Sequence, residues 1–95
     1  CGLFQGRRRE TDAKNQQLPV PAGDVDAVVL SHAHTDHAGR LPYLVAQGYD
    51  GPVHATAATR DLCGIMLRDS ARIQVKDAEF LARRGREAVA PLYDE

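Results

Sequence analysis

Ser31-His32-Ala33-His34-Thr35-Asp36-His37 is the most informative segment of this 95-residue chain. It holds three of the four histidines and a carboxylate within six residues. Residues 25–30, VDAVVL, come just before it, and this short apolar, β-branched run predicts a strand buried on both faces. In an extended chain, His32 and His34 then point to the same side, roughly 6.5–7 Å apart at the backbone. The sequence therefore predicts two imidazoles side by side at the end of a buried strand.

Histidines and an aspartate at this spacing are typical ligands of zinc. His32 and His34 can converge on one ion at bond lengths of ~2.0–2.1 Å. Asp36 and His37 follow where the backbone must turn into a helix, are aimed away from the first pair, and can hold a second ion. Two ions ~3.5–4 Å apart would share and activate one water molecule. In the alternative interpretation each histidine is only hydrogen-bonded within a polar loop, but four ligand-type residues at one strand end favour the metal site.

The residues after the motif predict a helix. It should begin at Ala38 or Gly39, because Pro42 fits only in a first turn, where its missing N–H is no loss. Gly48 is a fitting C-terminal stop. The apolar positions that should form its buried stripe are Leu41, Leu44 and Val45. The positive end of this helix would then face Asp36 and His37, which favours an ionised carboxylate and an anionic substrate.

The rest of the chain predicts a second strand and a second, longer helix. Residues 52–55 should be a short strand, and Thr56 the N-cap of the helix that follows. One helical stripe of apolar residues is expected to be buried: Leu62, Ile65, Met66 and Ile73. Residues 76–84 can continue the helix as a basic, solvated segment that ends at Gly85. Residues 7–17 lack apolar periodicity and are expected to be a solvated loop. The expected order of buried strand, motif loop, helix, strand and helix indicates the α/β class.

Several polar residues outside the motif have more than one interpretation. Arg40 could reach a scissile phosphate or form a surface ion pair. The arginines at 7–9 could contact phosphate, but a solvated surface with acidic neighbours is the simpler expectation. His54 is expected to be a hydrogen-bonded structural histidine. Cys1 and Cys63 form no C-x-x-C pair and are expected to be small buried residues in a reducing cytoplasm.

The H-x-H-x-D-H pattern of residues 32–37 resembles the metal motif of the metallo-β-lactamase fold superfamily. Residues 38–73 look like the β-CASP branch of that superfamily, the RNA-processing nucleases. The stretches that carry this likeness are AGRLPYLVAQG (38–48), GPVHAT (51–56) and IMLRDSARI (65–73), with CGLFQG (1–6) and APLYDE (90–95) at the two ends. The resemblance implies a partial α/β/β/α sandwich in which residues 1–95 are the N-terminal part of one metallo-β-lactamase domain, with no second domain.

The resemblance also implies a hydrolase with two zinc ions. His32 and His34 would hold the first zinc, Asp36 and His37 the second, and Asp36 could take a proton from the nucleophile. The family adds an aspartate just before the Cys-Gly, a third histidine, a bridging aspartate and one more histidine, all outside residues 1–95. Because the chain starts at Cys1 and its one methionine is Met66, we expect an internal fragment that holds part of one active site.

The expected reaction is hydrolysis of phosphodiester bonds in RNA, by endonucleolytic or exonucleolytic cleavage. A net charge of −1 gives no sign of nucleic acid, so RNA as the partner rests on the resemblance. Two alternatives stay open: the same fold acting on DNA, a thioester or a lactam, and a non-catalytic scaffold subunit of an RNA-processing complex. The intact ligand motif argues against the scaffold. No apolar run approaches the ~20 residues of a membrane span, and the expected location is the cytoplasm.

Overall fold

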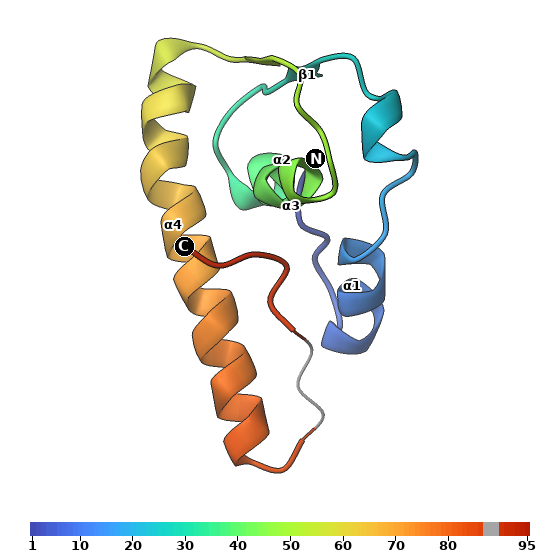
Figure 1. Ribbon diagram of the computed structural model, residues 1–95. Helices are drawn as coiled ribbons and strands as arrows, with labels where there is room; N and C mark the ends of the chain where they lie inside the picture. The colour runs from blue at the N-terminus through green and yellow to red at the C-terminus, as the bar shows by residue number, and fades with distance from the viewer. Residues whose placement is uncertain (87–89) are drawn as a thin grey trace.

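The computed structural model describes residues 1–86 and 90–95 and has the mixed helix and strand content expected of the α/β class (Figure 1). Its elements in chain order are α1 (Arg8–Asn15), the 3-10 turn η1 (Ala22–Asp24), β1 (Val28–Val29), α2 (Thr35–Ala38), α3 (Leu41–Ala46), β2 (Val53–His54) and α4 (Ala57–Arg83). The two strands pair in parallel, with Val28 opposite Val53. Because α2 and α3 lie between them in sequence, β1, α2, α3 and β2 form one β–α–β unit.

The predicted strand at 25–30 is shorter than expected and is buried on one face only. Leu30 N donates to the His54 carbonyl (2.9 Å), so the pairing reaches one residue beyond β1. Val28 and Leu30 point into the core, whereas Val29 between them is 78% exposed. Side chains alternate between the two faces of a strand, and the described residues cover only one of those faces. The prediction of burial on both faces is therefore wrong for this chain. The His54 side chain in β2 is exposed, and the backbone carbonyl of His54 accepts the hydrogen bond from Leu30 N.

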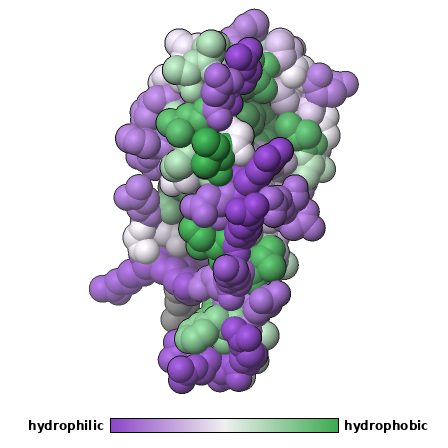
Figure 2. Space-filling model, turned by 90° about the vertical axis from the view of Figure 1, so that its left-hand side faces the viewer, coloured by the Kyte–Doolittle hydropathy of each residue, from purple (hydrophilic) through white to green (hydrophobic). Residues whose placement is uncertain are grey.

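The long helix α4 begins and ends as predicted but buries a different face. The Thr56 hydroxyl accepts from Thr59 N (3.2 Å) as an N-cap, and Gly85 follows the helix end with a positive φ of 68°. The predicted stripe is largely exposed, with Ile65 at 69%. The face turned inward consists mostly of small residues: Thr59, Cys63, Ser70, Ala71 and Leu81. Small side chains let α4 pack closely against α2. Figure 2, which views α4 from outside, shows hydrophobic surface at several points along it, interrupted by hydrophilic side chains.

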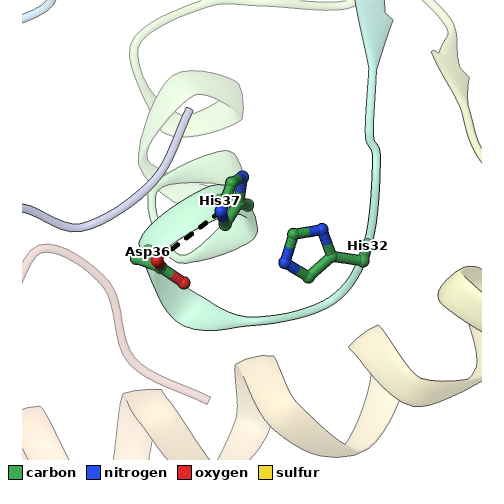
Figure 3. A group of neighbouring side chains, drawn as sticks. All are labelled: His32, Asp36 and His37. Atoms are coloured by element: carbon green, nitrogen blue, oxygen red, sulfur yellow. Dashed lines mark ion pairs between the residues drawn. The ribbon is translucent and has the colours of Figure 1, made fainter.

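The predicted helix after the motif is two short helices, and the first begins earlier than expected. Ala38 N and His37 N both donate to the His34 carbonyl (2.9 Å), so α2 starts at Thr35 with His34 as its N-cap residue. Asp36 and His37 therefore lie on the helix itself (Figure 3).

The break between α2 and α3 comes from Pro42, which lies in the first turn of α3 as predicted. Proline has no N–H to donate to the carbonyl four residues earlier, so a helix that contains Ala38 cannot run on through it. Leu44 is buried as expected, whereas Val45 is exposed, so only part of the predicted stripe faces the core. Gly48, just after α3, has a positive φ of 114° and ends the helix as predicted.

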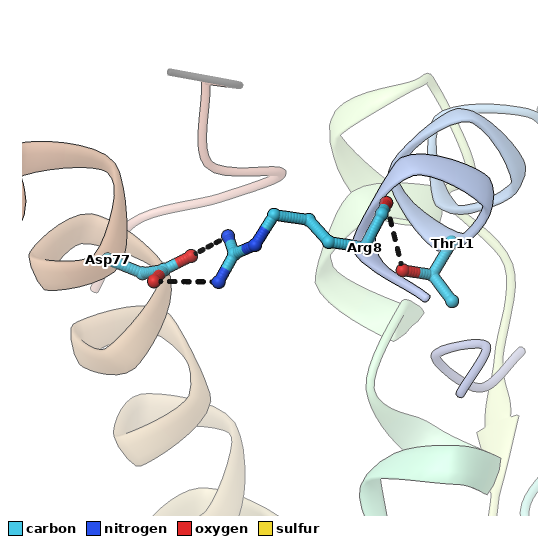
Figure 4. Close-up of polar contacts among 3 residues, drawn as sticks. All are labelled: Arg8, Thr11 and Asp77. Atoms are coloured by element: carbon cyan, nitrogen blue, oxygen red, sulfur yellow. Dashed lines mark hydrogen bonds and ion pairs between the residues drawn. The ribbon is translucent and has the colours of Figure 1, made fainter. Parts of the chain in front are cut away.

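Residues 8–15 form the helix α1, so the prediction of a loop over residues 7–17 is wrong. The helix has no apolar stripe, and polar contacts connect it to the rest of the chain, an ion pair with α4 among them. The Arg8 guanidinium donates to both carboxylate oxygens of Asp77 in α4, and Thr11 Oγ1 donates to the Arg8 carbonyl (3.2 Å) (Figure 4). This pairing lowers the pKa of Asp77. Within the part of the chain that is described, no helix is long and apolar enough to cross a membrane.

Candidate metal centre

Three residues of the motif converge at the edge of the β–α–β unit. One ligand atom from each of His32, Asp36 and His37 lies within 4.8 Å of the other two (Figure 3). His32 comes from the loop after β1, and the other two come from α2. His32 is half-buried, whereas Asp36 and His37 are exposed. A cluster open to solvent on one side leaves room for a substrate.

The loop that carries His32 is fixed by its apolar neighbours. Leu30 and Ala33 are both buried in the core, so the loop is held from both sides of His32. The Ser31 hydroxyl lies 2.9 Å from His32 Nδ1, and this contact occupies that nitrogen. Nε2 is then the ring nitrogen left for a metal, in keeping with the common use of the second nitrogen of a ligating histidine for a hydrogen bond.

His34 is exposed and stands beside the cluster. Its ring meets the His32 ring edge-on, with centroids 4.9 Å apart and planes at 84°. The His37 ring lies closer to His32, at a centroid distance of 4.0 Å. All four predicted ligands thus occupy one small region, but His32 groups with the α2 pair. The early start of α2 explains this, because it turns Asp36 and His37 back toward the loop. The assignment of these four residues as ligands stays a prediction.

The donor set indicates which ions the cluster could hold. Two imidazoles and a carboxylate suit zinc and other first-row transition metals better than calcium or magnesium, which prefer oxygen ligands. In a tetrahedral zinc site the ligand atoms lie about 3.3 Å apart, as follows from bonds of ~2.0–2.1 Å. The spread of 4.8 Å is therefore within reach of small side-chain rotations. His37 Nε2 and Asp36 Oδ2 are already 3.5 Å apart.

Arg40 holds neither of the roles considered from the sequence. It is 6% exposed and donates to backbone carbonyls, from Nε to Gly2 (2.7 Å) and from a terminal nitrogen to Gln17 (2.7 Å). Its guanidinium also lies over the Phe4 ring, 5.0 Å from the centroid. Burial lowers the pKa of Arg40. The residue therefore ties the N-terminal segment and the end of α1 to the start of α3, with its guanidinium occupied by backbone carbonyls.

Two further contacts hold α2 from outside the motif. Leu3 N donates to the Thr35 carbonyl (2.8 Å), and the Tyr93 hydroxyl donates to the Gly39 carbonyl (2.6 Å). Burial raises the pKa of Tyr93. Neither contact can be predicted from a local sequence pattern, because the bonded residues lie 32 and 54 positions apart in the chain. Of the two cysteines, Cys63 is buried as predicted, and burial raises the pKa of its thiol, but Cys1 is exposed.

The chain is an α/β domain whose β–α–β unit carries a cluster that could hold a metal ion. Residues 1–91 match the family model of the Metallo-beta-lactamase superfamily, and the chain belongs to that superfamily, as the sequence predicted. Membership in this superfamily implies metal ions.

Three relatives show which members of the superfamily the chain is similar to. The chain is 48% identical over 84 residues to "Ribonuclease TTHA0252" of Thermus thermophilus, a match of 84% of this chain and 18% of the relative. It is 51% identical over 57 residues to "Transcription termination factor FttA" of Methanothermobacter thermautotrophicus, covering 60% of this chain and 9% of the relative. The FttA protein of Pyrococcus abyssi is 38% identical over 77 residues, which is 80% of this chain and 12% of the relative. The chain thus spans less than a fifth of the length of each of these relatives.

Proposed function

We propose that the protein containing this chain is a zinc-dependent ribonuclease of the β-CASP branch, and that residues 1–95 are the N-terminal part of its metallo-β-lactamase domain. The observation that carries the proposal is the convergence of His32, Asp36 and His37 in a chain of this superfamily. RNA as the substrate is supported by the relatives, one named a ribonuclease and others a transcription termination factor. The same names, together with two free cysteines, support a cytoplasmic location.

The side chains divide into binding and proton-handling roles. We assign His32 and His34 to one zinc and Asp36 and His37 to a second, with His32 close enough to the α2 pair to serve either position. Bound zinc supplies a Lewis acid and lowers the pKa of its water toward ~7. Asp36 is exposed at the cluster and is the carboxylate placed to accept a proton from the attacking water. The imidazoles fix the geometry, and Ser31 holds the His32 ring through Nδ1.

The cluster alone offers enough donors for one catalytic zinc but not for two. Two imidazoles and one carboxylate supply three protein ligands, whereas a tetrahedral site has four positions. A catalytic site keeps one of these for water or substrate, but a second zinc would need ligands beyond this cluster. The resemblance puts such ligands outside residues 1–95, so the activity belongs to the full-length protein.

The test compares one cluster histidine with the histidine outside it. In the full-length protein, His32→Ala should remove about one zinc per chain and abolish cleavage of a fluorescent RNA. His54→Ala is the matched control, because His54 is exposed and lies in β2 outside the cluster; it should keep both metal content and turnover. Parallel assays with DNA, a thioester and a β-lactam separate the alternative substrates. Full zinc occupancy in His32→Ala would contradict the ligand assignment, and a zinc-loaded wild type that cleaves none of the substrates would favour the scaffold alternative.

A further inference from the structure

The N-terminal segment lies directly on the helix that carries two of the proposed ligands. Leu3 N donates to the Thr35 carbonyl and Arg40 N donates to the Cys1 carbonyl, both at 2.8 Å. Arg40 Nε donates to the Gly2 carbonyl between them (2.7 Å). The N-terminus accordingly lies at α2 and α3 in Figure 1. Three consecutive residues are thus bonded to α2 or to the residues that follow it.

Gly2 sits where this contact is tightest. A Cβ atom at Gly2 would lie 2.6 Å from His37 N and closer still to the Asp36 carbonyl, whereas real Cβ atoms essentially never approach another heavy atom within 3.0 Å. The atoms it would meet are backbone atoms, which cannot rotate away. Gly2 is not among the glycines with positive φ, so the requirement for glycine here comes from space and not from conformation.

Gly39, at the end of α2, is also crowded where the N-terminal segment meets this helix. A Cβ atom at Gly39 would lie 2.7 Å from Leu3 Cγ and closer still to the Thr35 carbonyl oxygen. Crowding is not general among the glycines: a Cβ at Gly23 or Gly64 would meet nothing within 4 Å, and the crowding at Gly51 involves Tyr49 and Asp26. Gly2 and Gly39 are therefore the glycines at which the crowding lies between the N-terminal segment and α2.

We propose that Gly2 is a positioning residue, which seats the N-terminal segment on α2 and thereby sets the distance of Asp36 and His37 from His32. The inference rests on the proposed function, because it assumes that the cluster binds zinc. Ala38 is 0% exposed and α4 packs against α2, so α2 has no room to retreat. Ordinary contact begins near 3.4 Å, so a methyl group at residue 2 requires a shift of at least about 0.8 Å relative to His37 N and a larger one relative to the Asp36 carbonyl. Metal–ligand distances tolerate only about ±0.2 Å.

The test measures metal binding separately from stability in the full-length protein. Gly2→Ala should weaken zinc binding about 10- to 100-fold in a chelator competition, the range typical of changes in groups that orient metal ligands. It should also change the ligand-field spectrum of the cobalt(II)-substituted protein. Gly64→Ala is the matched control and should bind zinc with wild-type affinity. Leu3→Ala removes packing but keeps the backbone contact, so it should lower the melting temperature and leave zinc affinity unchanged.

The possible outcomes distinguish a positioning role of Gly2 from a purely structural one. If wild type itself binds no zinc, the proposed function fails and takes this inference with it. If wild type binds zinc and Gly2→Ala matches its affinity and cobalt spectrum, only the positioning role is overturned. Should Gly2→Ala not fold, Gly39→Ala tests the same contact with the same expected loss of affinity. If both fail to fold while Gly64→Ala folds, Gly2 is a purely structural residue and the inference is wrong.

Discussion

Replacing Arg40 with methionine should loosen the N-terminal segment from α2 and α3. Methionine keeps an unbranched apolar side chain beside Phe4 but donates no hydrogen bond, so the carbonyls of Gly2 and Gln17 each lose a 2.7 Å bond. A hydrogen bond from a charged donor contributes ~1.5–3 kcal/mol. Removing the charge also recovers the desolvation cost that lowers the pKa of Arg40. The net loss should therefore be about 2–4 kcal/mol.

The loss is measured as hydrogen exchange of the Leu3 amide, which donates to the Thr35 carbonyl. Because each 1.4 kcal/mol is a factor of ten, exchange in Arg40→Met should be faster by roughly 30- to 1,000-fold. Arg60→Met is the control, since Arg60 is exposed and bonds only its neighbour Asp61 (3.1 Å) among the contacts described; it should change exchange less than about threefold. An equally small change in Arg40→Met would show that Arg40 does not hold the N-terminal segment on α2 and α3.

Three further predictions address the site, the chain alone and the α1 contact. Asp36→Asn in the full-length protein should abolish cleavage with a near-normal melting temperature, because an amide keeps much of the local hydrogen bonding but not the charge; a large fall in melting temperature with activity retained would make Asp36 a structural residue only. Residues 1–95 expressed alone should bind zinc weakly by isothermal titration, show no nuclease activity and tend to aggregate, and tight binding with turnover would show that the site is complete within them. The coupling between Arg8 and Asp77 in a double-mutant cycle should be under ~1 kcal/mol at pH 7, since both side chains are partly exposed. It should fade as the pH falls below 4 through the lowered pKa of Asp77, because a carboxylate whose pKa is depressed on folding stabilises only while it is ionised; a coupling that does not change with pH would contradict the ion pair.

The features that local chemistry determines could be predicted from the sequence. Thr56 caps α4 because its hydroxyl reaches an N–H three residues on, and Pro42 lies in a first turn because it has no N–H to donate. The closeness of His32, Asp36 and His37 belongs to the same group, since these residues lie within six positions on a strand end and the helix that follows. Their grouping in space depended on a detail the pattern did not fix, the start of α2 at Thr35.

The features that distant partners determine could not be predicted in this way. α1 has no apolar stripe and is held by Asp77, 69 residues from Arg8. α4 turns small residues such as Ala71 toward the core because α2 lies close, while larger apolar residues such as Ile65 stay exposed. Arg40 looked like a surface or substrate residue because nothing near it in sequence shows that Gly2 and Gln17 would supply acceptors. Crowding at Gly2 likewise exists only once the N-terminal segment lies on α2.

The most direct test of the metal centre is X-ray absorption at the zinc edge of the full-length protein as purified. The proposed site predicts tightly bound zinc whose first shell contains only nitrogen and oxygen at ~2.0–2.1 Å, with the outer-shell scattering of imidazole rings from His32, His34 and His37. Cys63 is buried in the core and is not part of the cluster, and a sulfur shell at ~2.3 Å is therefore not expected. Sulfur in the first shell, or protein free of zinc and unable to take it up, would contradict the assignment of this cluster as the metal site.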